Sequence, residues 1–190
     1  MSMPLVFPLG FLFFLLIWVI VVYNGLVQIR QMVRESWSGI DTELKRRYDL
    51  IPNVVEVVKG YATHEKELFK AVTEARNQAV ASTGNTSSQA KDERHLVTSM
   101  RQLLAVAESY PDLKASKHYL DLQDELSNTE DRIQAARRFF NANVRDLNTK
   151  VESFPSNIIA SLFNFEKEDF FEVEKAVIRN VVDISFSDHP

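Results

Sequence analysis

The amino-acid sequence predicts an all-α protein: a single N-terminal transmembrane helix, an elongated antiparallel, up-and-down helical bundle, and a short C-terminal helical and extended segment. Three observations lead to this fold class. The N-terminus is a long apolar run, and no charged side chain precedes Arg30. Apolar residues then recur at seven-residue spacing, which is typical of packed helices. Glycine and proline are scarce, at 5 and 6 in 190 residues, which disfavours an all-β domain.

Residues 1–25 are expected to form a membrane anchor. The stretch from Leu5 to Val22 is almost purely apolar. At a rise of ~1.5 Å per residue it is about 27 Å long, close to the ~30 Å hydrocarbon core of a bilayer. Trp18 and Tyr23 suit the membrane–water interface. Because no Lys or Arg precedes this run and no small residues close it, a retained anchor is favoured over a cleaved signal peptide.

Basic residues flank the anchor only on its C-terminal side, at Arg30, Arg34 and then 45–47. The positive-inside rule therefore puts the N-terminus outside and the following domain in the cytoplasm. The sequence predicts a single-pass protein of the cell membrane, that is, the inner or cytoplasmic membrane.

Residues 26–153 are expected to form the long-helix bundle. A first helix is predicted over 26–81, with two neighbouring apolar lines: Leu44, Ile51, Val58, Val72 and Ala79, and Tyr48, Val55, Ala62 and Phe69. Pro52 lacks an amide donor and disfavours helix at the residue before it, so a kink or short break is expected there. Asp49 would then cap the start of a new helix.

Two further helices are predicted, over 90–109 and 116–153. The apolar lines that define them are Leu96, Met100, Leu103 and Ala107 in the former, and Tyr119, Leu126, Ile133, Phe140 and Leu147 in the latter. At ~1.5 Å per residue the last helix exceeds about 50 Å and can lie along the whole first helix. Short loops between long amphipathic helices favour antiparallel neighbours.

Residues 154–190 are expected to pack on the bundle end. Short helices are predicted over 158–163 and 168–177, and the alternating stretch 181–186 is expected to be extended. Aromatic side chains are denser here than a short segment can bury against itself. They are expected to cap the bundle end, or to dock on a partner or on the bilayer surface. The candidate docking residues are Phe163, Phe165, Phe170 and Phe171.

A charged stretch supplies the candidate structural or interaction motif, which consists of Arg46, Arg47, Tyr48, Asp49, Pro52, Asn53 and, from the last long helix, Glu130. One interpretation is that residues 45–47 hold anionic head groups, at about 1 kcal/mol per charge. They lie ~23 residues beyond the bilayer, however, so the helix would have to bend back. The preferred interpretation is that Arg46 or Arg47 pairs inside the bundle with Glu125, Glu130 or Asp49 and sets the helix register.

No catalytic, cofactor-binding or metal-binding residue is predicted, and no small-molecule substrate. His64 and Glu65 begin like a zinc-protease helix motif, but Leu68 occupies the position of the second histidine. The chain has no cysteine, no glycine-flanked serine nucleophile and no glycine-rich phosphate loop. The net charge of -4 disfavours nucleic-acid binding.

Several stretches together resemble the LemA family: LKRRYDLIPN at 44–53, KGYA at 59–62, AVAESYPDLKA at 105–115, LSNTE at 126–130 and FPSN at 154–157. Two small departures are Ser36, where alanine is usual, and Asn164, where glycine is common. The resemblance implies a single-pass bacterial membrane protein with an antiparallel helical bundle and no established enzymatic activity. It also implies envelope partners, such as a membrane protease.

The leading functional hypothesis is a non-enzymatic membrane-anchored adaptor or scaffold of the bacterial cell envelope. Its expected partners are the lipid bilayer and an envelope protein. The alternative is a homo-oligomeric protein that organises membrane, because heptad-like seams also permit self-association. An enzyme with an unrecognised site is the least favoured hypothesis.

Overall fold

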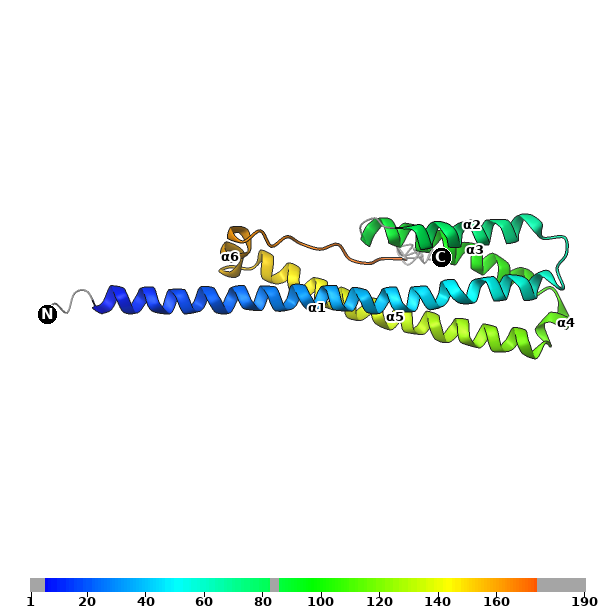
Figure 1. The fold of residues 1–190 in the computed structure, drawn as a ribbon, viewed down its shortest axis with the longest axis horizontal. Helices are drawn as coiled ribbons and strands as arrows, with labels where there is room; N and C mark the ends of the chain where they lie inside the picture. The colour runs from blue at the N-terminus through cyan, green and yellow to red at the C-terminus, as the bar shows by residue number, and fades with distance from the viewer. Residues whose placement is uncertain (1–5, 83–85, 174–190) are drawn as a thin grey trace, which may run out of the picture.

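The computed structural model describes residues 6–82 and 86–173, and in these ranges the chain is helical without strands (Figure 1). The all-α prediction is confirmed. The helices are α1 (Val6–Lys59), α2 (Lys66–Ala81), α3 (Thr86–Ala107), α4 (Pro111–Lys114), α5 (Lys117–Glu152) and α6 (Ser156–Leu162).

The long helices form an elongated antiparallel bundle from which the start of α1 projects alone (Figure 1). α5 lies along the C-terminal part of α1, and α2 and α3 pair as a hairpin beside the end of α1. α6 packs against α1 at the end of the bundle from which the start of α1 projects. The predicted up-and-down arrangement is therefore confirmed.

The heptad positions of the sequence make the bundle core. In one hydrophobic cluster the structure buries all nine residues predicted from the two apolar lines of the first helix, and all five from the line of the last. Each fully buried Val, Leu, Ile or Phe contributes roughly 1.5–3 kcal/mol of transfer free energy. Along α1 the first fully buried side chain is Leu26, which marks where the bundle begins.

The single helix predicted over 26–81 is wrong, because the chain breaks between Lys59 and Lys66. Of the kink or short break expected at Pro52, the break is wrong, since α1 continues through this residue, and Asp49 lies inside α1 and caps nothing. Pro52 cannot donate to the carbonyl oxygen of Tyr48, four residues earlier. Arg76 of α2 supplies that bond from its Nε at 2.6 Å, so the carbonyl keeps a partner.

α6 ends in a hydrogen-bond pattern that favours glycine or asparagine at position 164. Asn164 has φ 54°, a left-handed conformation that glycine adopts freely and asparagine tolerates better than most residues. The backbone N–H of Phe165 donates to Ala160 at 2.9 Å, and that of Asn164 donates to Ser161 at 3.4 Å. This is the Schellman motif, and it turns the chain back along the bundle.

A helix was predicted over 168–177, of which the structure describes 168–173. No helix forms there: residues 165–172 instead run along α5. Two asparagines of α5 hold this segment by its backbone. Asn148 accepts from the N–H of Glu168 and donates to its carbonyl, both at 2.9 Å. Asn141 accepts from the N–H of Phe171 at 2.9 Å and donates to its carbonyl at 3.2 Å.

The spacing of these bonds matches a helix beside an extended chain. Seven helical residues rise about 10.5 Å, and three extended residues rise about 10 Å. Asparagines one heptad apart therefore meet backbone groups three residues apart. Residues 174–177 and the expected extended stretch 181–186 lie outside the described residues.

Candidate interaction site

Arg47 is the centre of a buried charged cluster that joins three helices. Its side chain is 2% exposed. One guanidinium nitrogen donates to the carboxylate of Glu93 on α3, and another donates to Glu130 on α5 at 2.8 Å. The hydroxyl of Tyr48 donates to the other carboxylate oxygen of Glu93. Because the backbone of Tyr48 also binds Arg76 of α2, two consecutive residues of α1 contact all the other long helices.

Burial raises the pKa of two groups in this cluster, Glu93 and Tyr48. Desolvation raises the pKa of Glu93, while the charge of Arg47 and the bonds from Tyr48 and Arg47 oppose that rise. Burial, together with the charge of Glu93, raises the pKa of Tyr48 far above its ordinary value, so its hydroxyl stays a donor. Removing one partner of a buried ion pair typically costs about 3–5 kcal/mol, because the other charge is left without compensation.

The structure contains one of the ion pairs expected from the sequence, between Arg47 and Glu130. Arg46 instead lies at the surface, 3.9 Å from Glu43. Asp49 and Glu125, the other expected partners, are exposed, as are Pro52 and Asn53. The head-group interpretation is wrong for Arg47, since the unbroken α1 places it about 36 Å beyond Tyr23 at ~1.5 Å per residue.

Sequence reasoning missed Glu93, the acidic partner with 0% exposure. A signal was present, because Glu93 continues the buried line of Leu96, Met100 and Leu103. An acidic residue on a core line predicts a buried cationic partner, since an unpaired charge there is strongly disfavoured.

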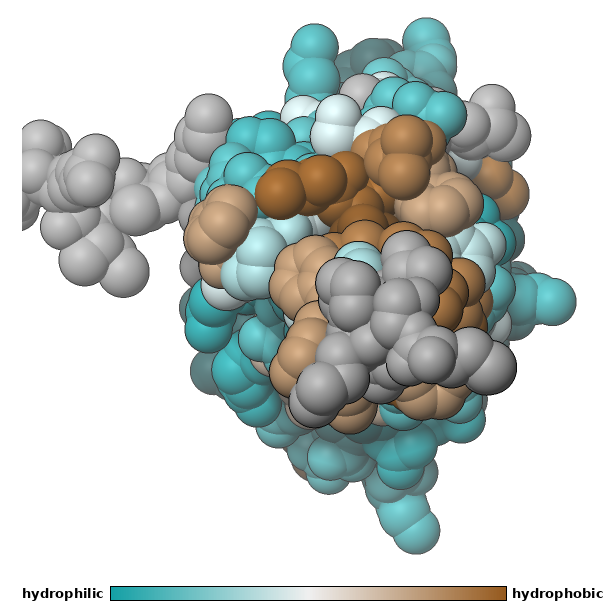
Figure 2. All heavy atoms as spheres, turned by 90° about the vertical axis from the view of Figure 1, so that its left-hand side faces the viewer, coloured by the Kyte–Doolittle hydropathy of each residue, from teal (hydrophilic) through white to brown (hydrophobic). Residues whose placement is uncertain are grey.

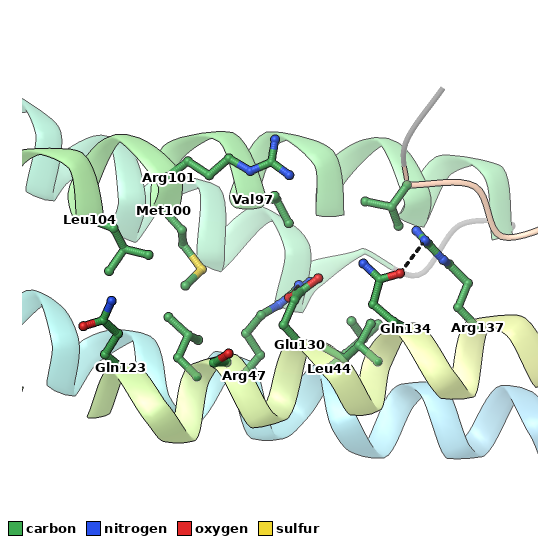
Figure 3. A pocket seen from close by; sticks show the side chains of 14 residues that line it. Leu44, Arg47, Val97, Met100, Arg101, Leu104, Gln123, Glu130, Gln134 and Arg137 are labelled. Carbon is green, nitrogen blue, oxygen red and sulfur yellow. Dashed lines mark hydrogen bonds and ion pairs between the residues drawn. The ribbon is translucent and has the colours of Figure 1, made fainter. Parts of the chain in front are cut away.

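An open groove lies above this cluster, between α3 and α5 (Figure 3). Its volume is about 340 Å³. The apolar lining comes from three helices and from the last described residue: Leu44, Val97, Met100, Leu104, Leu126, Ile133 and Val173. Polar side chains stand on α5 along one side, where Arg137 donates to the Gln134 amide oxygen at 2.9 Å.

The four candidate docking phenylalanines divide into two kinds. Phe165 and Phe171 are buried, whereas Phe163 and Phe170 are 46% and 39% exposed. The ring of Phe171 lies 5.3 Å from Trp37, between centroids. The rings of Phe163 and Phe165 lie 4.8 and 5.8 Å from that of Tyr23.

The anchor end of the bundle has a hydrophobic cluster of its own. Leu26, Ile159, Ala160 and Phe165 form its buried part, with Trp18, Val19, Val22, Tyr23, Val27 and Val151 packed around them. The guanidinium of Arg30 lies 4.6 Å from the centroid of the Phe165 ring. Three predicted anchor residues, Trp18, Val22 and Tyr23, thus pack against a cluster that includes residues of the C-terminal segment; Leu5 lies outside the described residues.

α1 is a candidate membrane span by length and composition, and its apolar window is 6% buried in the structure. Phe7, Phe11 and Phe14 are among the exposed side chains of this window. Within residues 6–82 and 86–173, no group of three or more His, Asp or Glu side chains is placed to hold a metal ion.

Residues 36–186 match the sequence profile of the LemA family. This chain belongs to the LemA family. Protein LemA of Metamycoplasma hominis is 26% identical over 165 residues, covering 83% of this chain and 75% of the relative. Magnetosome protein MamQ of Magnetospirillum gryphiswaldense is 22% identical over 179 residues, covering 81% of this chain and 66% of the relative. MamQ 1 of Paramagnetospirillum magneticum has the same identity and coverage. None of these three relatives has a name that describes an enzyme.

Proposed function

We propose that this LemA-family chain is a non-enzymatic, membrane-anchored adaptor of the bacterial envelope that receives a helix of a partner protein in the α3–α5 groove. The groove itself is the observation that carries the proposal. Helix-in-groove recognition uses an apolar cleft between helices, which accepts side chains spaced one helical turn apart on the partner. A cavity of about 340 Å³, half of whose lining residues are apolar, has this character.

The buried cluster supports a binding role more than a catalytic one. Glu93, with 0% exposure, lies beneath the groove and is bonded to Arg47 and Tyr48, so these groups join helices and do not face solvent. Arg137 on the rim favours an acidic side chain on the partner, because its hydrogen-bond partner Gln134 is neutral and does not offset its positive charge. An acidic amphipathic helix of an envelope protein, such as a membrane protease, fits these features.

Location and orientation belong to the same proposal. The anchor would span the cytoplasmic membrane with its N-terminus outside, because Arg30 and Arg34 follow the apolar run and no basic residue precedes it. The groove would then face the cytoplasm. A single cysteine at exposed Phe139, which the cysteine-free chain makes unique, should resist an impermeant maleimide in intact cells and react after lysis.

Photo-crosslinking in native membranes tests the adaptor function. A photo-reactive residue at Val97 or Leu104 lies in the groove, and one at exposed Glu74 on α2 serves as the control position. We expect one discrete adduct with a second protein from the groove positions alone. Ser127→Trp should abolish it by filling the groove, whereas Asn128→Trp, at the exposed neighbouring position outside the groove lining, should leave it.

Other adducts would contradict the adaptor function. Adducts between two copies of the chain would favour the homo-oligomeric alternative. Adducts within one chain, to residues 174–190, would show that the groove binds its own C-terminus. Equal adducts in the presence of Ser127→Trp would show that capture does not use the groove.

A further inference from the structure

α6 carries apolar side chains that nothing in the described structure covers. Ile158 and Leu162, one helical turn apart, are 55% and 69% exposed, and Phe154 just before the helix is 81% exposed. No charged residue occurs between Glu152 and Glu166. The opposite side of α6 is buried, since Ile159 and Ala160 pack against α1. α6 is therefore apolar both toward the bundle and away from it.

The depth of α6 follows from the residues of α1 on which it packs. Trp18, Val19 and Val22 pack against the cluster to which Ile159 and Ala160 of α6 belong, and these residues of α1 are part of the apolar run that is long enough to cross a bilayer. A helix that contacts them lies at the depth where α1 leaves the hydrocarbon core. Figure 2, which views this end of the molecule, shows hydrophobic residues gathered near its centre, with hydrophilic ones around them.

Cationic groups stand at the same end. A side chain at Gly25 would meet the amine of Lys150 at 3.4 Å, so this amine lies beside α1 just past the anchor. Arg30 lies five residues further along α1, over the ring of Phe165. Cations at this depth attract anionic lipid head groups by about 1 kcal/mol each.

We propose that the face of α6 formed by Ile158 and Leu162, with Phe154 beside it, inserts into the bilayer interface as a second membrane attachment. Interfacial helices bury an apolar face about 5–10 Å into the boundary between head groups and acyl chains. α6 is short for such a helix, but α1 already holds it at that boundary. Its insertion therefore requires no separate recruitment to the membrane.

Site-specific fluorescence with the full chain tests this attachment. The natural sequence has no cysteine, so Ile158→Cys and Leu162→Cys each give a unique site for an environment-sensitive dye. The protein is reconstituted in phosphatidylethanolamine and phosphatidylglycerol vesicles whose acyl chains carry a nitroxide quencher near the head group. Phe139→Cys provides the matched control, because Phe139 is an apolar side chain with 62% exposure on α5.

We expect at least twofold stronger lipid quenching at positions 158 and 162 than at 139, with blue-shifted emission. Adding Phe154→Glu should reduce the quenching at 158, and its effect on folding should be small because Phe154 is exposed. Water-like emission at 158 and 162, equal to that at 139, would overturn the proposal. Blue-shifted emission without lipid quenching would also overturn it, because protein would then cover this face.

Discussion

The side chain of Arg76 replaces the backbone donor that Pro52 lacks, with its Nε bonded to the carbonyl oxygen of Tyr48 at 2.6 Å. In an uninterrupted α-helix the N–H of residue 52 would donate to this carbonyl. The bond therefore does two things: it satisfies α1 at its proline, and it attaches α2 to α1. A residue that ordinarily breaks a helix here leaves the Tyr48 carbonyl oxygen free to accept a bond from another helix.

Arg76 and Pro52 should be energetically coupled. Arg76→Met leaves the Tyr48 carbonyl without its donor, which should lower the free energy of unfolding by about 1–3 kcal/mol. In a Pro52→Ala background the alanine N–H supplies the bond, so the same change should cost about 1 kcal/mol less. Urea denaturation of the four proteins in detergent measures this cycle. Additive effects would mean that the Arg76 bond does not compensate for Pro52.

Arg47 and Arg46 are adjacent in sequence and should respond very differently to substitution. Arg47→Met leaves the fully buried Glu93 without its cation, so a loss of about 3–5 kcal/mol is expected. Arg46→Met removes a side chain that is 42% exposed and lies 3.9 Å from Glu43, so a change below about 0.5 kcal/mol is expected. Thermal unfolding of both variants tests this difference, and equal melting temperatures would contradict the role of the cluster.

The pH dependence of stability should include a contribution from Glu93. Because burial raises its pKa above 4.5 in the folded protein, the folded state holds this proton more tightly than the unfolded chain. The corresponding stability is fully present below pH 4.5 and is lost as pH rises through the folded-state pKa.

Glu93→Gln removes this titration and keeps an oxygen that can accept from Tyr48. We expect the stability of the wild type relative to this variant to fall with rising pH, measured by urea denaturation from pH 4 to about 8. A relative stability that rises over this range would show that pairing with Arg47 outweighs the effect of burial on the pKa.

The two asparagines of α5 should each protect a different backbone amide. Asn148→Ala removes the acceptor of the Glu168 N–H, and Asn141→Ala removes that of the Phe171 N–H. Loss of a bond of about 1 kcal/mol should speed hydrogen exchange of the corresponding amide roughly fivefold. Residue-resolved exchange by NMR in detergent distinguishes the two. If either variant accelerated both amides equally, the segment would be held as one unit.

Position 164 should prefer glycine and reject β-branched residues. Asn164 has a positive φ of 54°, so Asn164→Gly should be neutral or stabilising by up to about 1 kcal/mol, and Asn164→Val should cost about 1–2 kcal/mol. Both variants can be ranked by thermal unfolding. A stable valine variant would mean that α6 can end without its left-handed residue.

The helices and their buried faces could be predicted because heptad spacing depends only on local geometry. Leu44, Ile51 and Val58 were assigned to the core from their spacing alone, and they are 0–1% exposed. The break at Pro52 could not be judged in this way. Its cost depends on Arg76, which lies 24 positions further along the chain and becomes a neighbour only when α2 packs beside α1.

The candidate site was predictable only in part for the same reason. An arginine inside the bundle requires an acidic partner, and Glu130 was among those named. Glu93 was hidden because the second helix was predicted to begin near 90, where a first-turn acid is ordinarily a surface residue. The stretch 168–172 was predicted to be helical from its amphipathic pattern, but backbone bonds to Asn141 and Asn148 hold it without helix.

The unbroken course of α1 from Val6 to Lys59 makes the bundle mechanically continuous with its anchor. No joint lies between Tyr23 and Leu26, so rotation of the anchor about its axis turns the groove by the same angle. Insertion of one residue there would rotate the bundle by about 100° and raise it ~1.5 Å. A tilt of ~20° within the bilayer would swing the far end of α1, some 50 Å beyond Leu26, sideways by about 17 Å. The position and direction of the groove would thus depend on the rotation and tilt of the anchor within the lipid.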